Sequence, residues 1–192
     1  LSFIDQRTIP EGERDNFIGA QKLALARIQK LESINTPNSH DNQRHLLKMV
    51  LVMNPQADGL AEKIQKRLLD LEYDNFKRLA LWEDKAAEPN QGRQQMWNFY
   101  EKSRSLKVAN YQKAALEKLF QWEGSTEKVL SELKDSSDET LISYYVEDQY
   151  KKKNYEVLQA YLVGKSKEPS LSQGFRKKLF ARSLEVQFLF AE

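Results

Sequence analysis

Histidine side chains can act in catalysis and can bind metal ions. His40 and His45 are the only two, and they lie five residues apart at the start of a predicted helix. Two metal ligands on one helix face need a spacing of three or four residues, so this pair predicts surface residues. The chain has no cysteine, which excludes disulfides, thiolate zinc sites and cysteine nucleophiles. Ser-His-Asp and Cys-His arrangements therefore have little to be built from.

Acidic residues cluster at positions 135–139 and again at Glu147-Asp148. A general acid–base pair needs burial to separate the pKa values of two carboxyls, and no segment places two acids in an apolar pocket. The first cluster is explained by a loop and a helix N-terminus, where negative charge is favourable. Residues 124–128 lack the glycine spacing and the preceding strand of a phosphate-binding loop. We expect no catalytic residues, cofactor or metal, although an enzyme of unrecognised type remains an alternative.

Basic residues recur in the C-terminal third of the chain. They are Lys151, Lys152, Lys153, Lys165, Lys167, Arg176, Lys177 and Lys178. A positive patch of this kind would suit nucleic acid or an anionic membrane surface. However, acids are interspersed and the formal net charge is only +2, which favours an ordinary solvated face and no nucleic-acid partner. The longest apolar run, residues 49–53, is far below the ~20 residues of a membrane span, so none is predicted.

The elements that carry these residues are predicted to be helices. The composition, with 40% hydrophobic and 30% charged residues, is typical of a folded chain. Apolar residues recur at steps of three or four, and no run alternates for long enough to predict a strand. The sequence therefore predicts an all-α fold, a helical bundle of about nine helices. Residues 1–12 form an irregular arm, residues 13–105 an N-terminal helical unit and residues 106–192 a C-terminal one, joined by one continuous core.

Turn and cap signals divide the second half of the chain. Gly124 and Ser125 are predicted to stop one helix and to cap the next. Ser136 and Glu139 have the spacing of a capping box at the start of the following helix.

Aromatic residues are frequent, with three Trp, eight Tyr and nine Phe. At core spacing on helices they bury large apolar areas, so we expect Trp122 and Tyr145 to lie in the core. Tyr and Trp also dominate binding hot spots in protein interfaces. Three tyrosines, Tyr100, Tyr144 and Tyr161, are therefore candidates for exposed partner contacts.

One ordered set of features lies between Leu116 and Asn154. The residues that form it are Leu119, Trp122, Gly124, Ser125, Val129, Leu133 and Tyr145, followed by the basic tail at 151–154. This order resembles the WY-domain unit of RXLR-type effectors of oomycete plant pathogens. Segments 60–69 and 171–180 are similar to the extra leucine-rich helices of its tandem version. The resemblance implies stacked, degenerate WY-like helical units with a structural core of Leu119, Trp122, Val129, Leu133 and Tyr145.

The same resemblance implies a function without catalysis. Such a protein is secreted by the pathogen, delivered to the host cytoplasm and binds a host cytosolic protein to interfere with immunity. These effectors bind through variable surfaces outside the shared core, so the resemblance implies no binding residues. The alternative is an intracellular, cytoplasmic helical adaptor or scaffold domain that binds proteins of its own organism. The two hypotheses differ in what is encoded upstream of Leu1, a signal peptide with a basic segment or further cytosolic sequence.

Overall fold

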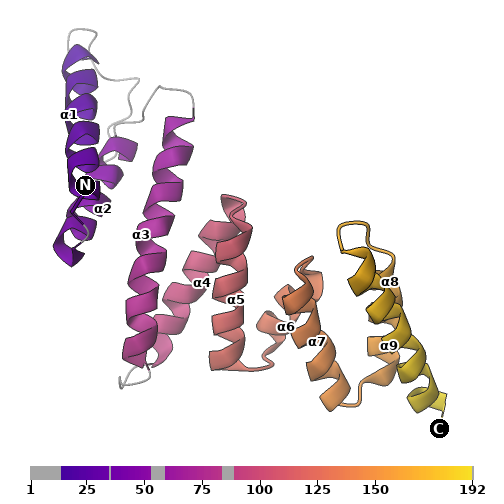
Figure 1. The fold of residues 1–192 in the computed structure, drawn as a ribbon. Helices are drawn as coiled ribbons and strands as arrows, with labels where there is room; N and C mark the ends of the chain where they lie inside the picture. Colours follow the sequence, from indigo (N-terminus) through magenta and orange to yellow (C-terminus); the bar gives the residue numbers. More distant parts are fainter. Residues whose placement is uncertain (1–13, 35, 53–58, 84–88, 192) are drawn as a thin grey trace. The chain divides into compact units, whose positions relative to one another are not determined.

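The computed structural model describes residues 14–34, 36–52, 59–83 and 89–191. These residues form nine helices and no strand, which confirms the all-α prediction (Figure 1). The helices are α1 (Arg14–Glu32), α2 (Pro37–Val52), α3 (Leu60–Glu83), α4 (Pro89–Ser105), α5 (Ala109–Glu123), α6 (Glu127–Asp135), α7 (Glu139–Lys151), α8 (Tyr155–Ser166) and α9 (Gln173–Ala191). The predicted irregular arm, residues 1–12, lies outside the described residues.

The helices group into two compact units. The first takes in α1 to α3 and residues 89–92 and 101–107, and the second takes in residues 93–100 and α5 to α9. This grouping differs from the predicted division after residue 105 chiefly at residues 93–100, the middle of α4, which group with the second unit. Contacts between this part of α4 and residues further along the chain explain the grouping. The indole Nε1 of Trp97 donates to Glu123 Oε1 at 2.8 Å, and Phe99 packs its ring 5.7 Å from that of Tyr111.

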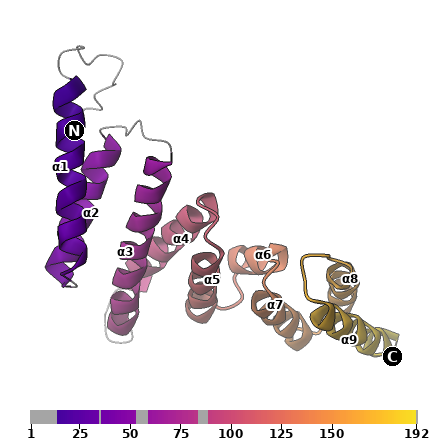
Figure 2. The ribbon, with the colours of Figure 1, turned by 45° about the horizontal axis from the view of Figure 1, so that its top comes forward.

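The first unit is built on the apolar faces of α1, α2 and α3. Its buried cluster consists of Ile28, Leu47, Val50, Ile64 and Leu71. Helices α1 and α2 lie side by side in both views (Figures 1 and 2). The buried amide of Gln43 on α2 donates from Nε2 to the carbonyl oxygen of Leu31 at 3.1 Å. The same carbonyl, in the last turn of α1, also accepts from the backbone N–H of Ile34 at 3.0 Å.

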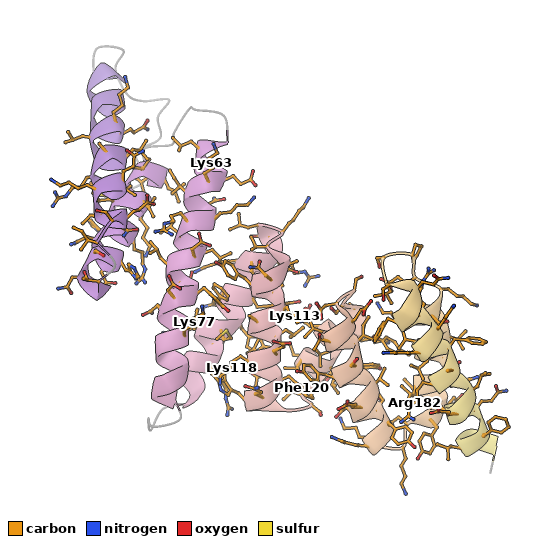
Figure 3. All side chains as sticks on the ribbon, in the orientation of Figure 1. Lys63, Lys77, Lys113, Lys118, Phe120 and Arg182 are labelled. Atoms are coloured by element: carbon orange, nitrogen blue, oxygen red, sulfur yellow. The ribbon has the colours of Figure 1, made fainter. Side chains whose placement is uncertain are left out.

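The second unit has an apolar cluster where α7, α8 and α9 meet. The buried members are Ile142, Leu158, Leu162, Leu171, Leu179 and Val186. Helices α8 and α9 pack together closely, and α6 packs against both α5 and α7. Arg182, labelled in Figure 3, extends from α9 and places its guanidinium carbon 4.3 Å from the ring centroid of Tyr150 on α7.

The caps of α6 and α7 differ by one or two residues from the predicted ones. Thr126 rather than Ser125 caps α6, and its hydroxyl accepts from the backbone N–H of Val129. Asp138 caps α7 by accepting from two backbone N–H groups in its first turn. The predicted capping box of Ser136 and Glu139 is therefore wrong, because a carboxylate at the position just before the helix takes those donors instead.

Candidate functional site

The residues of the WY-like segment lie on three consecutive helices of the second unit. Leu119 on α5 and Val129 and Leu133 on α6 are fully enclosed, and Tyr145 on α7 is buried. Burial raises the pKa of Tyr145, and the negative charge of Asp148 one turn further along α7 adds to the effect. These four side chains belong to the interior of the unit and are not available to a partner.

Trp122 differs from these four residues. It is only partly buried, whereas the enclosed residues of α5 are Ala115, Leu116 and Leu119. Trp122 lies in the last turn of α5, just before the chain turns at Gly124, which has a φ of 62°. The ammonium of Lys118 lies 5.1 Å from its ring centroid, within the range of a cation–π contact. The expectation that Trp122 lies in the core is therefore corrected to a position at the edge of the core.

Tyr100 is buried, so the expectation that it offers an exposed contact is wrong. Its hydroxyl donates to Glu132 Oε2 on α6 at 2.6 Å, and its ring meets that of Trp97 edge-on at 5.8 Å. The ammonium of Lys128 lies 3.7 Å from the centroid of the Trp97 ring. Tyr100 thus links α4 to α6 inside the second unit.

The other two candidate tyrosines are half-buried and engaged within the second unit. The ring of Tyr144 stacks on Phe120, labelled in Figure 3, with centroids 5.4 Å apart. The hydroxyl of Tyr161 donates to the carbonyl oxygen of Lys134 at 3.3 Å, and its ring lies 4.5 Å from that of Tyr145. Burial raises the pKa of Tyr161, with a further contribution from Tyr145. Neither ring is a free anchor of the kind that we expected.

A buried carboxylate, Asp148, joins the turn before α6 to the end of α7. Asp148 accepts a hydrogen bond from the hydroxyl of Ser125 and another from Gln149 Nε2 at 3.0 Å. Lys152 places its ammonium 2.9 Å from Asp148 Oδ2. A buried charge needs such pairing, and Ser125, Gln149 and Lys152 supply it here. The network therefore fixes the turn before α6.

A second polar cluster joins the α6–α7 loop to the α8–α9 loop, and Glu168 is its centre. Lys165 lies 2.8 Å from Glu168 Oε2, and Ser137 and Ser170 donate to Glu168 Oε1 at 2.7 and 2.9 Å. These bonds lower the pKa of Glu168 to about 2, and the hydrogen bond from Lys165 makes the largest contribution. Lys165 also donates to the carbonyl oxygen of Ser136 at 2.7 Å.

Two further bonds tie the start of α7 to other parts of the second unit. Glu139 Oε1 accepts from the backbone N–H of Ser172 at 3.0 Å, so it bonds the α8–α9 loop rather than its own helix start. Burial opposes ionisation of Asp138, but the hydrogen bond from Lys113 and the two backbone N–H groups outweigh it and lower its pKa. Figure 3 labels Lys113 on α5. These contacts stabilise the arrangement of the loops.

The basic residues of the C-terminal third do not all contribute to one free patch. Lys152 and Lys165 are paired with Asp148 and Glu168. Around the start of α9 the situation differs, because an open groove of about 450 Å³ is lined by Ser166, Gln173, Arg176, Lys177 and Phe180. Here cations stand beside an exposed aromatic ring.

Exposed apolar side chains on α9 are the feature that our sequence reading missed. Phe180 is 52% exposed, Leu184 44% and Phe188 75%. They follow one another at steps of four, which places them along one side of the helix. The opposite side carries Leu179 and Val186, which are buried against α8. The four-residue step was present in the sequence, but it indicates only a shared face and does not say which face is covered.

Possible metal and catalytic sites can be judged only on the described residues. Among them, no group of three or more His, Cys, Asp or Glu side chains is placed to hold a metal ion. His40 is half-buried and His45 is exposed on α2. Across the same residues, no helix has both the length and the apolar character needed to cross a membrane.

Searches of protein family models, curated proteins and solved structures find no significant match to this chain.

Proposed function

We propose that this protein is a non-catalytic effector of the RXLR type. It is secreted by an oomycete pathogen, delivered to the cytoplasm of the plant cell and binds a host cytosolic protein to interfere with immunity. The assignment to pathogen and host comes from the resemblance of residues 116–154 to the WY-domain unit. The assignment to protein binding comes from the surface of α9.

The arrangement of the WY-like segment supports the first part. The resemblance assigns Leu119, Trp122, Val129, Leu133 and Tyr145 to the core of one unit. All but Trp122 are buried, on helices that pack against one another in sequence order, and Trp122 lies partly exposed at the edge. Polar networks around Asp148 and Glu168 hold the intervening loops. A scaffold fixed in this way leaves its outer helix faces free to vary, as expected of a protein that binds through its surface.

The exposed apolar side of α9 is the observation that carries the second part. Phe180, Leu184 and Phe188 lie on one helix face and stay largely in contact with water. Burying a fully exposed side chain of this kind gains about 1.5–3 kcal/mol, so covering the 44–75% that is still exposed gains a corresponding fraction of that and is favourable. Contiguous exposed apolar residues of this kind mark interaction sites.

Sequencing the transcript upstream of the codon for Leu1 tests the effector assignment. A cleavable signal peptide followed by a short arginine-bearing segment is the expected result. Upstream sequence that encodes another cytosolic domain would contradict it and favour the alternative, an intracellular helical adaptor. Binding is tested separately by capture from plant extract, followed by titration of each purified candidate against the protein. The absence of any saturable host partner would contradict the binding function.

A further inference from the structure

Helix α9 is apolar on two opposite sides, and its own unit covers only one of them. Leu179, Ser183 and Val186 are buried on the inner side. Phe180, Leu184 and Phe188 occupy the outer side, and Leu189 next to Phe188 is 39% exposed. A surface helix normally has one apolar face, which packs against the core, and a polar face towards water. The outer side of α9 therefore has the composition of a face that another helix covers.

At the N-terminal end of this face, α9 carries basic residues and no acidic residue. Residues 173–184 contain Arg176, Lys177, Lys178 and Arg182 and no acid. The first acid, Glu185, is bonded to Arg182 at 2.5 Å. The Nε of Arg176 is buried and has no hydrogen-bond partner in the described structure. The groove of about 450 Å³ at this end brings Arg176 and Lys177 together with Phe180.

We propose that the outer face of α9 is the docking site for an acidic amphipathic helix of the partner protein. The apolar stripe of that helix covers Phe180, Leu184 and Phe188, and its carboxylates meet Arg176 and Lys177 at the groove. This inference rests on the proposed function and names the surface and the chemistry of the partner. Helix-in-groove binding uses anchors at steps of three and four residues, which is the spacing of the exposed residues here.

Two other occupants fit the surface less well. An anionic membrane would attract the basic residues, but its uniform negative surface would also face Glu185, whereas a helix can place its carboxylates at Arg176 and Lys177 alone. A second copy of α9, antiparallel and centred on Leu184, would set Lys177 against the apolar end of its partner. That arrangement supplies no negative charge to the basic end. An acidic helix supplies both the apolar cover and the charge.

A pair of synthetic peptides tests the proposal directly. Both carry the same leucine stripe at steps of three and four, with glutamate at the flanking positions in one and lysine in the other. Fluorescence anisotropy of each labelled peptide with the whole protein measures the two affinities. We expect the glutamate peptide to bind at least about tenfold tighter than the lysine peptide, and this preference to shrink as salt is raised.

Three variants assign the binding to this face. Phe188→Ala is expected to weaken binding of the glutamate peptide about tenfold, as the loss of an apolar anchor does. Lys177→Glu is expected to weaken the glutamate peptide and to strengthen the lysine peptide. Leu23→Ala is the matched control, because Leu23 is 76% exposed on α1 of the other unit, and it should change neither affinity. All three positions are exposed, so unchanged helicity and melting temperature show that folding is intact.

Several results would overturn the proposal. Equal affinity for the two peptides would show that charge does not define the site. Unchanged affinity of the glutamate peptide for Phe188→Ala would show that the apolar side of α9 does not define it. Sedimentation with phosphatidylserine vesicles that depends on Phe188, without peptide binding, would indicate a membrane surface. Dimerisation abolished by Phe188→Ala, again without peptide binding, would indicate a second copy.

The partner captured from plant extract separates this inference from the proposed function. If the purified partner binds Phe188→Ala and Lys177→Glu as tightly as the unaltered protein, the site on α9 is refuted while the binding function stands. If no host protein binds the unaltered protein, the binding function itself is refuted. If the partner binds and both variants weaken it, the site is supported.

Discussion

Replacing Glu168 by glutamine removes the negative charge at the contact between the α6–α7 loop and the α8–α9 loop. The hydrogen bonds from Ser137 and Ser170 can still form to the amide oxygen, but the ion pair with Lys165 is lost. The substitution therefore isolates the charge of the cluster from its geometry. Glu156→Gln, an exposed position on α8 of the same unit, is the matched control for the loss of one carboxylate.

The size of the effect follows from the pKa of Glu168, which is lowered from its ordinary 4.5 to about 2. Each pKa unit corresponds to about 1.4 kcal/mol, which gives an upper bound of about 3.5 kcal/mol at neutral pH. The side chain is 27% exposed, so screening by water reduces the expected loss in Glu168→Gln to about 1–2 kcal/mol.

The sign of the pH dependence follows from the same pKa. Because the folded-state pKa lies below that of the unfolded chain, the stabilisation is present above about pH 5 and is lost as pH falls towards 2. Urea unfolding at pH 7 and at pH 3 measures the free-energy difference between the original protein and Glu168→Gln. We expect that difference to shrink at pH 3. A difference that stays constant, or one that Glu156→Gln reproduces, would refute the role of the ion pair.

Four further substitutions test other contacts by the change in unfolding free energy. Leu133→Ala should cost about 2–5 kcal/mol because Leu133 is fully enclosed. Trp122→Ala should cost less, because Trp122 is only partly buried. A larger loss in Trp122→Ala than in Leu133→Ala would contradict the placement of Trp122 at the edge of the core. Tyr100→Phe removes a hydrogen bond to the carboxylate of Glu132 and should cost about 1.5–3 kcal/mol, and no measurable loss would argue against that bond. Asp138→Ala should cost about 1 kcal/mol through loss of the α7 cap, with a smaller effect expected in acid because the pKa of Asp138 is lowered.

The helices could be predicted because they depend on local pattern. Apolar residues at steps of three and four, broken by Pro, Gly and polar residues, indicate each amphipathic segment without reference to the rest of the fold. Cap residues were harder to predict. Ser125, Thr126, Ser136 and Asp138 are all good cap types within three residues of a helix start, and local preference does not choose among them. The choice depends on backbone geometry, as at Thr126, or on a distant bond, as where Glu139 accepts from Ser172.

Exposure could not be predicted because it depends on residues far along the chain. Tyr100 is buried where its hydroxyl donates to Glu132, which lies 32 residues further along the chain. No residue near Tyr100 in the sequence indicates that partner. The residues of α9 show the same limit. Leu179 and Phe180 are neighbours of similar type, yet one is buried against α8 and the other is open to water. Local pattern places residues on a helix, whereas packing decides which of its faces remains accessible.

Helix α4 has a consequence for how this protein opens in solution. It is one continuous helix, but residues 93–100 cluster with the second unit and residues 101–107 with the first. Backbone amides exchange with deuterium at rates set by the cooperative unit that must open to release them. Phe99 and Ser103 are both buried and lie one turn apart. We therefore expect a step in amide protection between them, and a mutation that destabilises only one unit should shift only one side of that step.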